Sequence, residues 1–150
     1  IALMPKARDF FTAEQQQQIV HAITEAEKRT SGEIRVHLED TCSGDPVQRA
    51  QTLFHKLGMH KTDLHNGVLI YLAVRDRQFA IIGDAGIDAK VPADFWVSVR
   101  NAMLEKFVQG AFADGLVIAI HEAGEKLAVY FPISDNDRNE VSNEISFRDV

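Results

Sequence analysis

A continuous apolar run over residues 67–74 constrains the fold of this chain more than any other feature. It is far shorter than the roughly 20 residues of a membrane-spanning helix. Such a run is typical of a strand buried on both faces of a sheet. Residues 75–78 form a polar turn and residues 79–82 are apolar again, which predicts a second strand that returns as a hairpin. A sheet buried on both faces needs helices on both faces.

A third strand precedes this hairpin. Residues 33–39 alternate between apolar and polar side chains, which predicts a half-buried strand. Between it and residues 67–74, Asp45 and Pro46 form a strong helix start, as cap and first helical residue, and Gly58 closes the helix. A strand, a helix and a strand in this order predict a right-handed crossover in which the two strands are parallel.

Helices are predicted on either side of these strands. Thr12 and Gln15 have the spacing of a capping box at the start of the first one. The predicted helices cover residues 13–30, 92–110 and 112–130. The order α-β-α-β-β-α-α therefore predicts an α/β fold, a three-layer α/β/α sandwich with a short mixed sheet. We expect one domain over residues 11–132, followed by a polar C-terminal tail over residues 133–150.

Composition narrows the function classes. The 150 residues carry a net charge of -6, which argues against a nucleic-acid or anionic-membrane surface and suits cation binding. The single cysteine, Cys42, excludes an intrachain disulfide and fits a reducing compartment. With no apolar run long enough for a membrane anchor, we expect a cytoplasmic domain that binds no nucleic acid.

The predicted topology brings acidic and amide side chains together. Parallel strands start at the same end of a sheet, and the returning hairpin strand ends there. The residues expected at this end are Glu33, Asp63, Asn66, Asp84 and Asp88. Hard cations such as Ca²⁺ and Mg²⁺ prefer several oxygen ligands from carboxylates, carbonyls and water. The sequence therefore predicts a metal site here, with the two aspartates of the glycine-punctuated loop after the hairpin as its main ligands.

Each candidate ligand also has a structural interpretation. The two loop aspartates are suited to turn hydrogen bonds or to capping a following helix. Glu33, Asp63 and Asn66 are suited to a strand edge, a loop and a turn, respectively. His60 and His65 flank the predicted site, where they would contact a metal or a phosphate, although exposed histidines are common on protein surfaces.

Three motifs follow one another in a fixed order. They are Ala26-Glu27 followed by TSGEIRV at 30–36, NGVLI at 66–70, and IIGDAGID at 81–88. In order and spacing they resemble the TPM domain family, the thylakoid-lumen phosphatase-like proteins and their bacterial relatives. The resemblance implies a compact α/β/α sandwich, a cleft that holds a divalent cation, often calcium, and a phosphatase activity claimed for some members.

The chain departs from the family's pattern at two places. Members often carry a Gly-x-Gly-hydrophobic-Glu loop after the hairpin, whereas here Asp84 stands at the first glycine and Asp88 at the glutamate. Members also often have an aspartate before the Asn-Gly pair, where this chain has His65. The departures leave the identity of the cation ligands open.

Two functions are compatible with these observations. The first is a metal-assisted phosphatase, in which the cation polarises a phosphoryl oxygen of a small phosphorylated substrate. No nucleophile motif accompanies it: six residues separate Cys42 from Arg49, whereas a cysteine phosphatase loop has five. The second is a non-enzymatic interaction or regulatory module that binds a protein partner and whose loop is stabilised by the cation.

Overall fold

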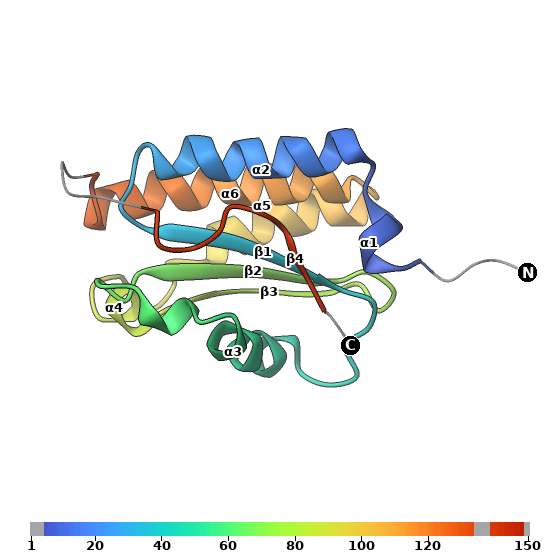
Figure 1. The fold of residues 1–150 in the computed structure, drawn as a ribbon, viewed down its shortest axis with the longest axis horizontal. Coiled ribbons are helices and arrows are strands. Elements are labelled where there is room, and N and C mark those ends of the chain that lie inside the picture. Colours follow the sequence, from blue (N-terminus) through green and yellow to red (C-terminus); the bar gives the residue numbers. More distant parts are fainter. Residues whose placement is uncertain (1–4, 134–138, 149–150) are drawn as a thin grey trace, which may run out of the picture.

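A four-stranded mixed sheet forms the centre of the molecule, in the strand order β3-β2-β1-β4 (Figure 1). The computed structural model describes residues 5–133 and 139–148. The strands are β1 (Glu33–Glu39), β2 (Gly67–Ala73), β3 (Gln78–Gly83) and β4 (Ser146–Phe147). β1 runs parallel to β2 and to β4, and β3 is antiparallel to β2. The predicted parallel crossover and hairpin are therefore confirmed.

The register of the strands fixes where their ends lie. Glu33 is opposite Gly67, and Val68 is opposite Gly83. The starts of β1 and β2 and the end of β3 therefore share one end of the sheet. We call this end, which carries Glu33, Asn66 and Asp84, the rim. It lies beside α4 in Figure 1.

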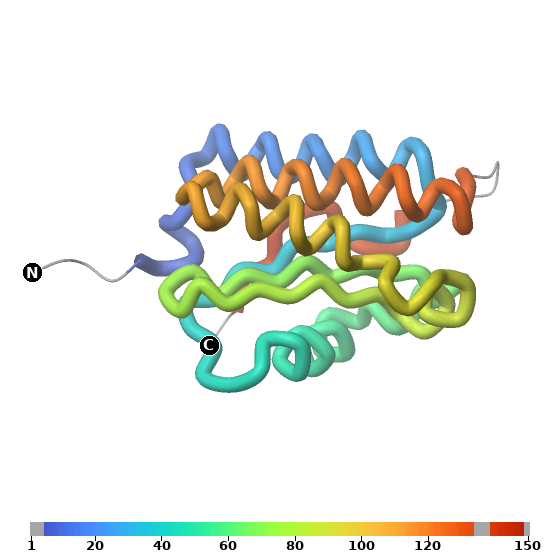
Figure 2. Tube along the Cα trace, turned by 180° about the vertical axis from the view of Figure 1, so that it is seen from behind, coloured from blue at the N-terminus to red at the C-terminus, as the bar shows by residue number. Residues whose placement is uncertain are grey.

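Helices cover both faces of the sheet. Their bounds are α1 (Ala7–Phe10), α2 (Ala13–Glu27), α3 (Pro46–Lys56), η1 (Met59–Lys61), α4 (Ala85–Asp88), α5 (Val97–Val108) and α6 (Phe112–Tyr130). α2, α5 and α6 lie on one face and α3 lies on the other, and the reverse view shows α5 on the same face as α6 (Figure 2). The predicted α/β/α sandwich is confirmed. Within the described residues, no helix has the length and apolar character needed to cross a membrane.

The two helix starts predicted from capping residues are confirmed. The Thr12 hydroxyl accepts the Gln15 N–H at 3.1 Å, and the Gln15 side chain accepts the Thr12 N–H at 3.0 Å. The Asp45 carboxylate accepts the Val47 N–H at 3.0 Å. These bonds satisfy backbone N–H groups that the helix itself leaves unpaired.

The core forms on both sides of β2, all of whose residues are buried. Val68 and Ile70 pack with residues of α2 and α6, whereas Leu69 and Tyr71 pack with α3. Fully burying one large aliphatic side chain contributes roughly 1.5–3 kcal/mol. This two-sided burial confirms the prediction, made from the continuous apolar run, that this strand is buried on both faces of the sheet.

The prediction of a half-buried first strand is wrong. His37 and Glu39 are 2% and 1% exposed, so both faces of β1 are covered. Arg49 of α3 reaches Glu39, and Ser146 of β4 reaches His37. His37 and Glu39 therefore contact polar partners inside the protein and do not face solvent.

Three segments differ from their predicted structure. The helix predicted from residue 92 begins at Val97. The residues before it form turns, in which the carbonyls of Pro92 and Asp94 accept the N–H groups of the residues three positions later. The predicted loop 83–91 contains α4. The polar tail predicted over residues 133–150 contributes β4 and buried apolar residues in its described part, whereas residues 134–138 and 149–150 lie outside the described residues.

Candidate functional site

The rim gathers polar side chains from three strands. Glu33 begins β1, Asn66 precedes β2, and Asp84 follows β3. Glu33 and Asn66 are 3% and 1% exposed, and the Asp84 side chain is 13% exposed. The Glu33 N–H donates to the Asn66 carbonyl at 3.2 Å, and the Asp84 N–H donates to the Gly67 carbonyl at 2.9 Å. Backbone hydrogen bonds therefore hold the three residues at one end of the sheet.

Asn66 is held in one orientation. Its side-chain amide donates to the Ser31 carbonyl at 3.2 Å, and its backbone N–H donates to the Thr62 hydroxyl at 3.3 Å. The Oδ1 atom points the other way and is buried, and within residues 5–133 and 139–148 it receives no hydrogen bond. Most buried polar atoms have a partner, so this oxygen is available to a ligand.

Asp84 divides its two carboxylate oxygens between two roles. Oδ1 accepts the Ala85 N–H at 2.7 Å as the cap of α4, which agrees with the structural interpretation of this residue. Oδ2 is buried and accepts no hydrogen bond from the part of the chain that the structure describes. The Nδ1 atom of His65 lies 3.5 Å from Oδ2. Capping therefore accounts for one oxygen of Asp84, whereas the other is buried near His65 without a hydrogen bond from the described residues.

Gly86 brings the Asp84 helix against the loop that carries Asn66. The Gly86 N–H donates to the His65 carbonyl at 2.9 Å. A Cβ atom at this position would lie 2.3 Å from the Leu64 carbonyl oxygen and 2.5 Å from that of His65. Only glycine allows this approach, so Gly86 fixes the spacing between α4, which follows Asp84, and the loop that ends at Asn66.

The remaining predicted residues lie farther out. Asp88 ends α4 and is exposed. Asp63 is also exposed, and its backbone N–H donates to the Glu140 carboxylate at 3.2 Å. The His60 ring stacks on His55 with 4.6 Å between centroids. Across the described residues, no group of three or more His, Cys, Asp and Glu side chains is arranged to hold a metal ion.

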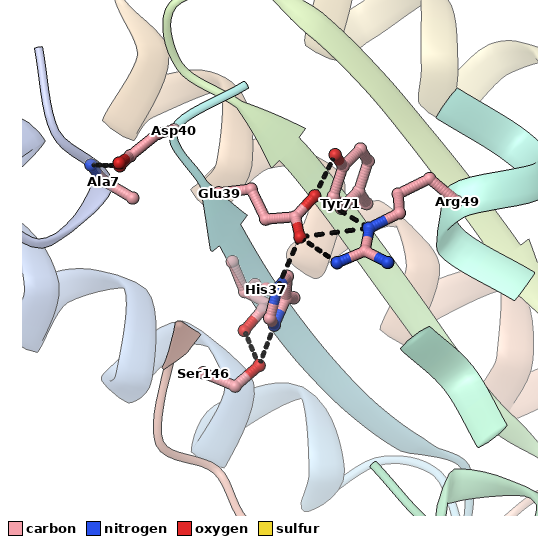
Figure 3. A network of polar contacts seen from close by, with 8 residues as sticks. Ala7, His37, Glu39, Asp40, Arg49, Tyr71 and Ser146 are labelled. Atoms are coloured by element: carbon pink, nitrogen blue, oxygen red, sulfur yellow. Dashed lines mark hydrogen bonds and ion pairs between the residues drawn. The ribbon is translucent and has the colours of Figure 1, made fainter. Parts of the chain in front are cut away.

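A second polar cluster lies toward the opposite end of β1 (Figure 3). The Arg49 guanidinium donates to both carboxylate oxygens of Glu39, and the Tyr71 hydroxyl donates to Glu39 at 2.5 Å. The His37 Nδ1 atom and the Ser146 hydroxyl lie 2.8 Å apart. The cluster joins α3, β1, β2 and β4. The alternation of β1 predicts on which face of the sheet His37 lies, but nothing in the sequence predicts the residues that cover this face.

The electrostatics of this cluster favour a charged pair. Burial alone would raise the pKa of Glu39, but hydrogen bonds from Arg49 and Tyr71 outweigh it and hold that pKa below its usual value. The hydrogen bond to Glu39 raises the pKa of Arg49 despite partial burial. Burial, together with the bond to Glu39, raises the pKa of Tyr71 far above its usual value. Glu39 is therefore ionised and Tyr71 neutral in the folded protein at neutral pH.

Serine, histidine and glutamate follow one another in this cluster, as in some hydrolase triads. A triad serine needs a hydroxyl that a substrate can reach. Ser146 is 7% exposed, and its hydroxyl lies 3.3 Å from the Val36 carbonyl, to which it donates. The cluster therefore joins β4 to β1 and has the character of a structural network.

The family comparison agrees with this architecture. The family model for the TPM domain matches residues 6–126. This chain belongs to the TPM domain family. The matched region contains β1, β2, β3 and the whole rim, whereas β4 lies beyond it.

Solved structures of TPM-like chains show the same fold. The chain is similar to the BA42 protein of the psychrophilic bacterium Bizionia argentinensis, with 52% identity, coverage of 93% of this chain and 96% of that one, and a TM-score of 0.88. The N-terminal domain of the Corynebacterium glutamicum protein cg2496 is 19% identical over 88% and 81% of the two chains, with a TM-score of 0.61. An N-terminal domain from P. gingivalis is 16% identical over 81% and 79%, with a TM-score of 0.67. No curated protein is significantly similar to this chain.

Proposed function

We propose that this TPM domain binds a divalent cation, Ca²⁺ or Mg²⁺, at the rim, with Asp84 and Asn66 as central ligands. The observation that carries the proposal is the pair of buried oxygens, Asp84 Oδ2 and Asn66 Oδ1, neither of which accepts a hydrogen bond within the described residues. Burying a carboxylate oxygen without a compensating group is costly. A bound cation removes this cost at both atoms.

The chemistry of the rim suits a hard cation. Ca²⁺ takes six to eight oxygen ligands and accepts carboxylates, amide oxygens, backbone carbonyls and water. Asp84 and Asn66 supply the first two kinds. Glu33 adds a second carboxylate at the same end of the sheet, and the exposed Asp63 and Asp88 add negative charge around it. In this proposal the two exposed aspartates attract the cation, and the buried residues hold it.

Metal-assisted phosphatase activity is the second candidate, and His65 is the observation that favours it. The His65 side chain is 60% exposed and its Nδ1 atom lies 3.5 Å from Asp84 Oδ2. A cation at the rim supplies polarisation of a phosphoryl oxygen. In this candidate function water would attack the phosphorus and the bond from phosphorus to the leaving oxygen would break. His65 would donate a proton to that leaving oxygen and regain one from the attacking water. Its exposed ring is accessible to a small phosphomonoester.

Thermal unfolding of the metal-stripped protein tests cation binding. A ligand at about 100 times its dissociation constant adds about 2.7 kcal/mol. For a chain of this size each kcal/mol raises Tm by about 2–4 °C. We expect Ca²⁺ or Mg²⁺ to raise Tm by about 5–10 °C in the parent and not in Asp84→Asn, which keeps a good capping residue. An equal shift in both proteins would reject Asp84 as a ligand.

Hydrolysis of a generic phosphomonoester separates the two functions. We expect turnover that requires the cation and is lost in both Asp84→Asn and His65→Ala. If the protein binds the cation but hydrolyses nothing in its presence, the phosphatase candidate is rejected. The interaction module, with the cation as a stabilising ligand, would then be the better description.

A further inference from the structure

We infer that the C-terminal segment, residues 139–148, completes the cation site, with Glu140 as a positioning residue for Glu33 and for the loop 62–66. This inference rests on the cation binding proposed above. The family model ends at residue 126, so the segment lies outside the matched region. It nevertheless returns to the rim and then runs along β1, as Figure 1 shows.

Glu140 joins two sides of the rim through two hydrogen bonds. Its backbone N–H donates to Glu33 Oε1 at 2.9 Å, and its carboxylate accepts the Asp63 N–H at 3.2 Å. The first bond orients the buried Glu33 carboxylate. The second restrains the loop that ends at Asn66. One residue of the C-terminal segment therefore fixes the start of β1 relative to the loop before β2.

The segment is fastened to the domain along its length. Val141 packs in the α3-side core, and Ile145 packs in the core on the opposite face. The Asn143 amide donates to the Thr24 hydroxyl of α2 at 3.2 Å, and Ser146 contacts His37. A docked segment thus holds Glu140 at the rim at little further entropic cost.

Thermodynamic linkage requires the docked segment and the bound cation to stabilise each other equally. If the docked segment favours the cation-binding geometry, the cation must favour the docked segment by the same factor. The cation should therefore slow hydrogen exchange of backbone amides in residues 139–148. A segment that only covers the edge of β1 would show no such response.

Calorimetric titration of the full chain with Ca²⁺ tests the role of Glu140. Glu140→Ala removes the acceptor for the Asp63 N–H, whereas Glu140→Gln keeps an amide oxygen there and loses only the charge. Because Glu140→Ala releases the loop 62–66 from the C-terminal segment, we expect it to raise Kd about tenfold, a loss of about 1.4 kcal/mol of binding. We expect Glu140→Gln to stay within about threefold of the parent, and Glu144→Ala, an exposed change in the same segment, to leave Kd unchanged.

The outcomes separate this inference from the proposed function. No Ca²⁺ or Mg²⁺ binding by the parent would overturn the rim site itself and the inference with it. Binding by the parent with an unchanged Kd in Glu140→Ala would overturn the inference alone. Equal losses of Ca²⁺ affinity in Glu140→Ala and Glu140→Gln would show that the charge of Glu140 matters and its hydrogen bond does not. That result would also overturn the inference. Unchanged exchange in residues 139–148 would reject the linkage.

Discussion

Gly86→Ala should destabilise the protein and weaken its cation site together. The added Cβ atom would lie 2.3 Å from the Leu64 carbonyl oxygen, and contacts under 3.0 Å essentially never occur. The loop must therefore withdraw by at least 0.7 Å, and both crowded atoms are backbone. Overpacking of this kind costs about 1–3 kcal/mol. Alanine also restricts the unfolded chain more than glycine does, which stabilises the folded protein by about 0.4–1 kcal/mol. We therefore expect the free energy of unfolding to fall by about 1–2 kcal/mol in total.

Gly44→Ala is the matched control. Nothing lies within 4 Å of a Cβ atom at Gly44, and its φ is not positive. At about 2–4 °C per kcal/mol, Gly86→Ala should unfold about 2–8 °C below the parent in calorimetry, and Gly44→Ala within a degree or two of it. The Ca²⁺ affinity should fall only in Gly86→Ala. Equal Tm values for the two variants would refute the close approach of α4 to the loop.

Three further predictions concern the cluster around Glu39 and the rim histidine, His65. Arg49→Ala leaves the buried Glu39 carboxylate without its guanidinium partner and should lower the free energy of unfolding, measured in urea, by about 3 kcal/mol. Arg29→Ala, which breaks an exposed pair with Glu125, should lower it by about 1 kcal/mol or less. Folding lowers the pKa of Glu39, so its charge stabilises the protein fully above about pH 4.3, the pKa of an unfolded glutamate, and less as the pH falls through the folded pKa. The stability difference between the parent and Glu39→Gln should therefore be constant from pH 8 to 6 and shrink toward pH 3; a difference that grows toward acid would contradict the assignment. His65→Ala should abolish phosphomonoester hydrolysis and leave cation binding within about threefold of the parent, and a tenfold loss of binding would make His65 a ligand instead.

The central topology was predictable from the sequence because local patterns specified it. The apolar run of β2, the turn before β3 and the capped start of α3 each had one simple interpretation. Parallel pairing of β1 and β2 then placed Glu33, Asn66 and Asp84 at one end of the sheet. That inference needed only strand directions, not side-chain contacts.

The contacts of the C-terminal segment were not predictable, because they join residues far apart in the sequence. Val141 and Ile145 are isolated apolar residues in a polar stretch, which has neither a helical nor a strand period. The bond from Glu140 to Glu33 spans 107 positions. For the same reason the alternation of β1 wrongly suggested that His37 faces solvent. Its cover comes from β4.

The most direct test of the cation site is a Ca²⁺ titration followed by tryptophan fluorescence. Trp96 is the only tryptophan in the chain. Its ring would lie 3.2 Å from a Cβ atom added at Gly83, so it packs beside the residue that precedes Asp84. We predict a saturable change in emission in the parent and in Asp94→Asn, an exposed control with the same change of charge. In Asp84→Asn the apparent Kd should rise at least about tenfold, the loss of about 1.4 kcal/mol of binding. Emission unchanged by millimolar Ca²⁺ or Mg²⁺, with no heat of binding, would contradict the rim as a cation site.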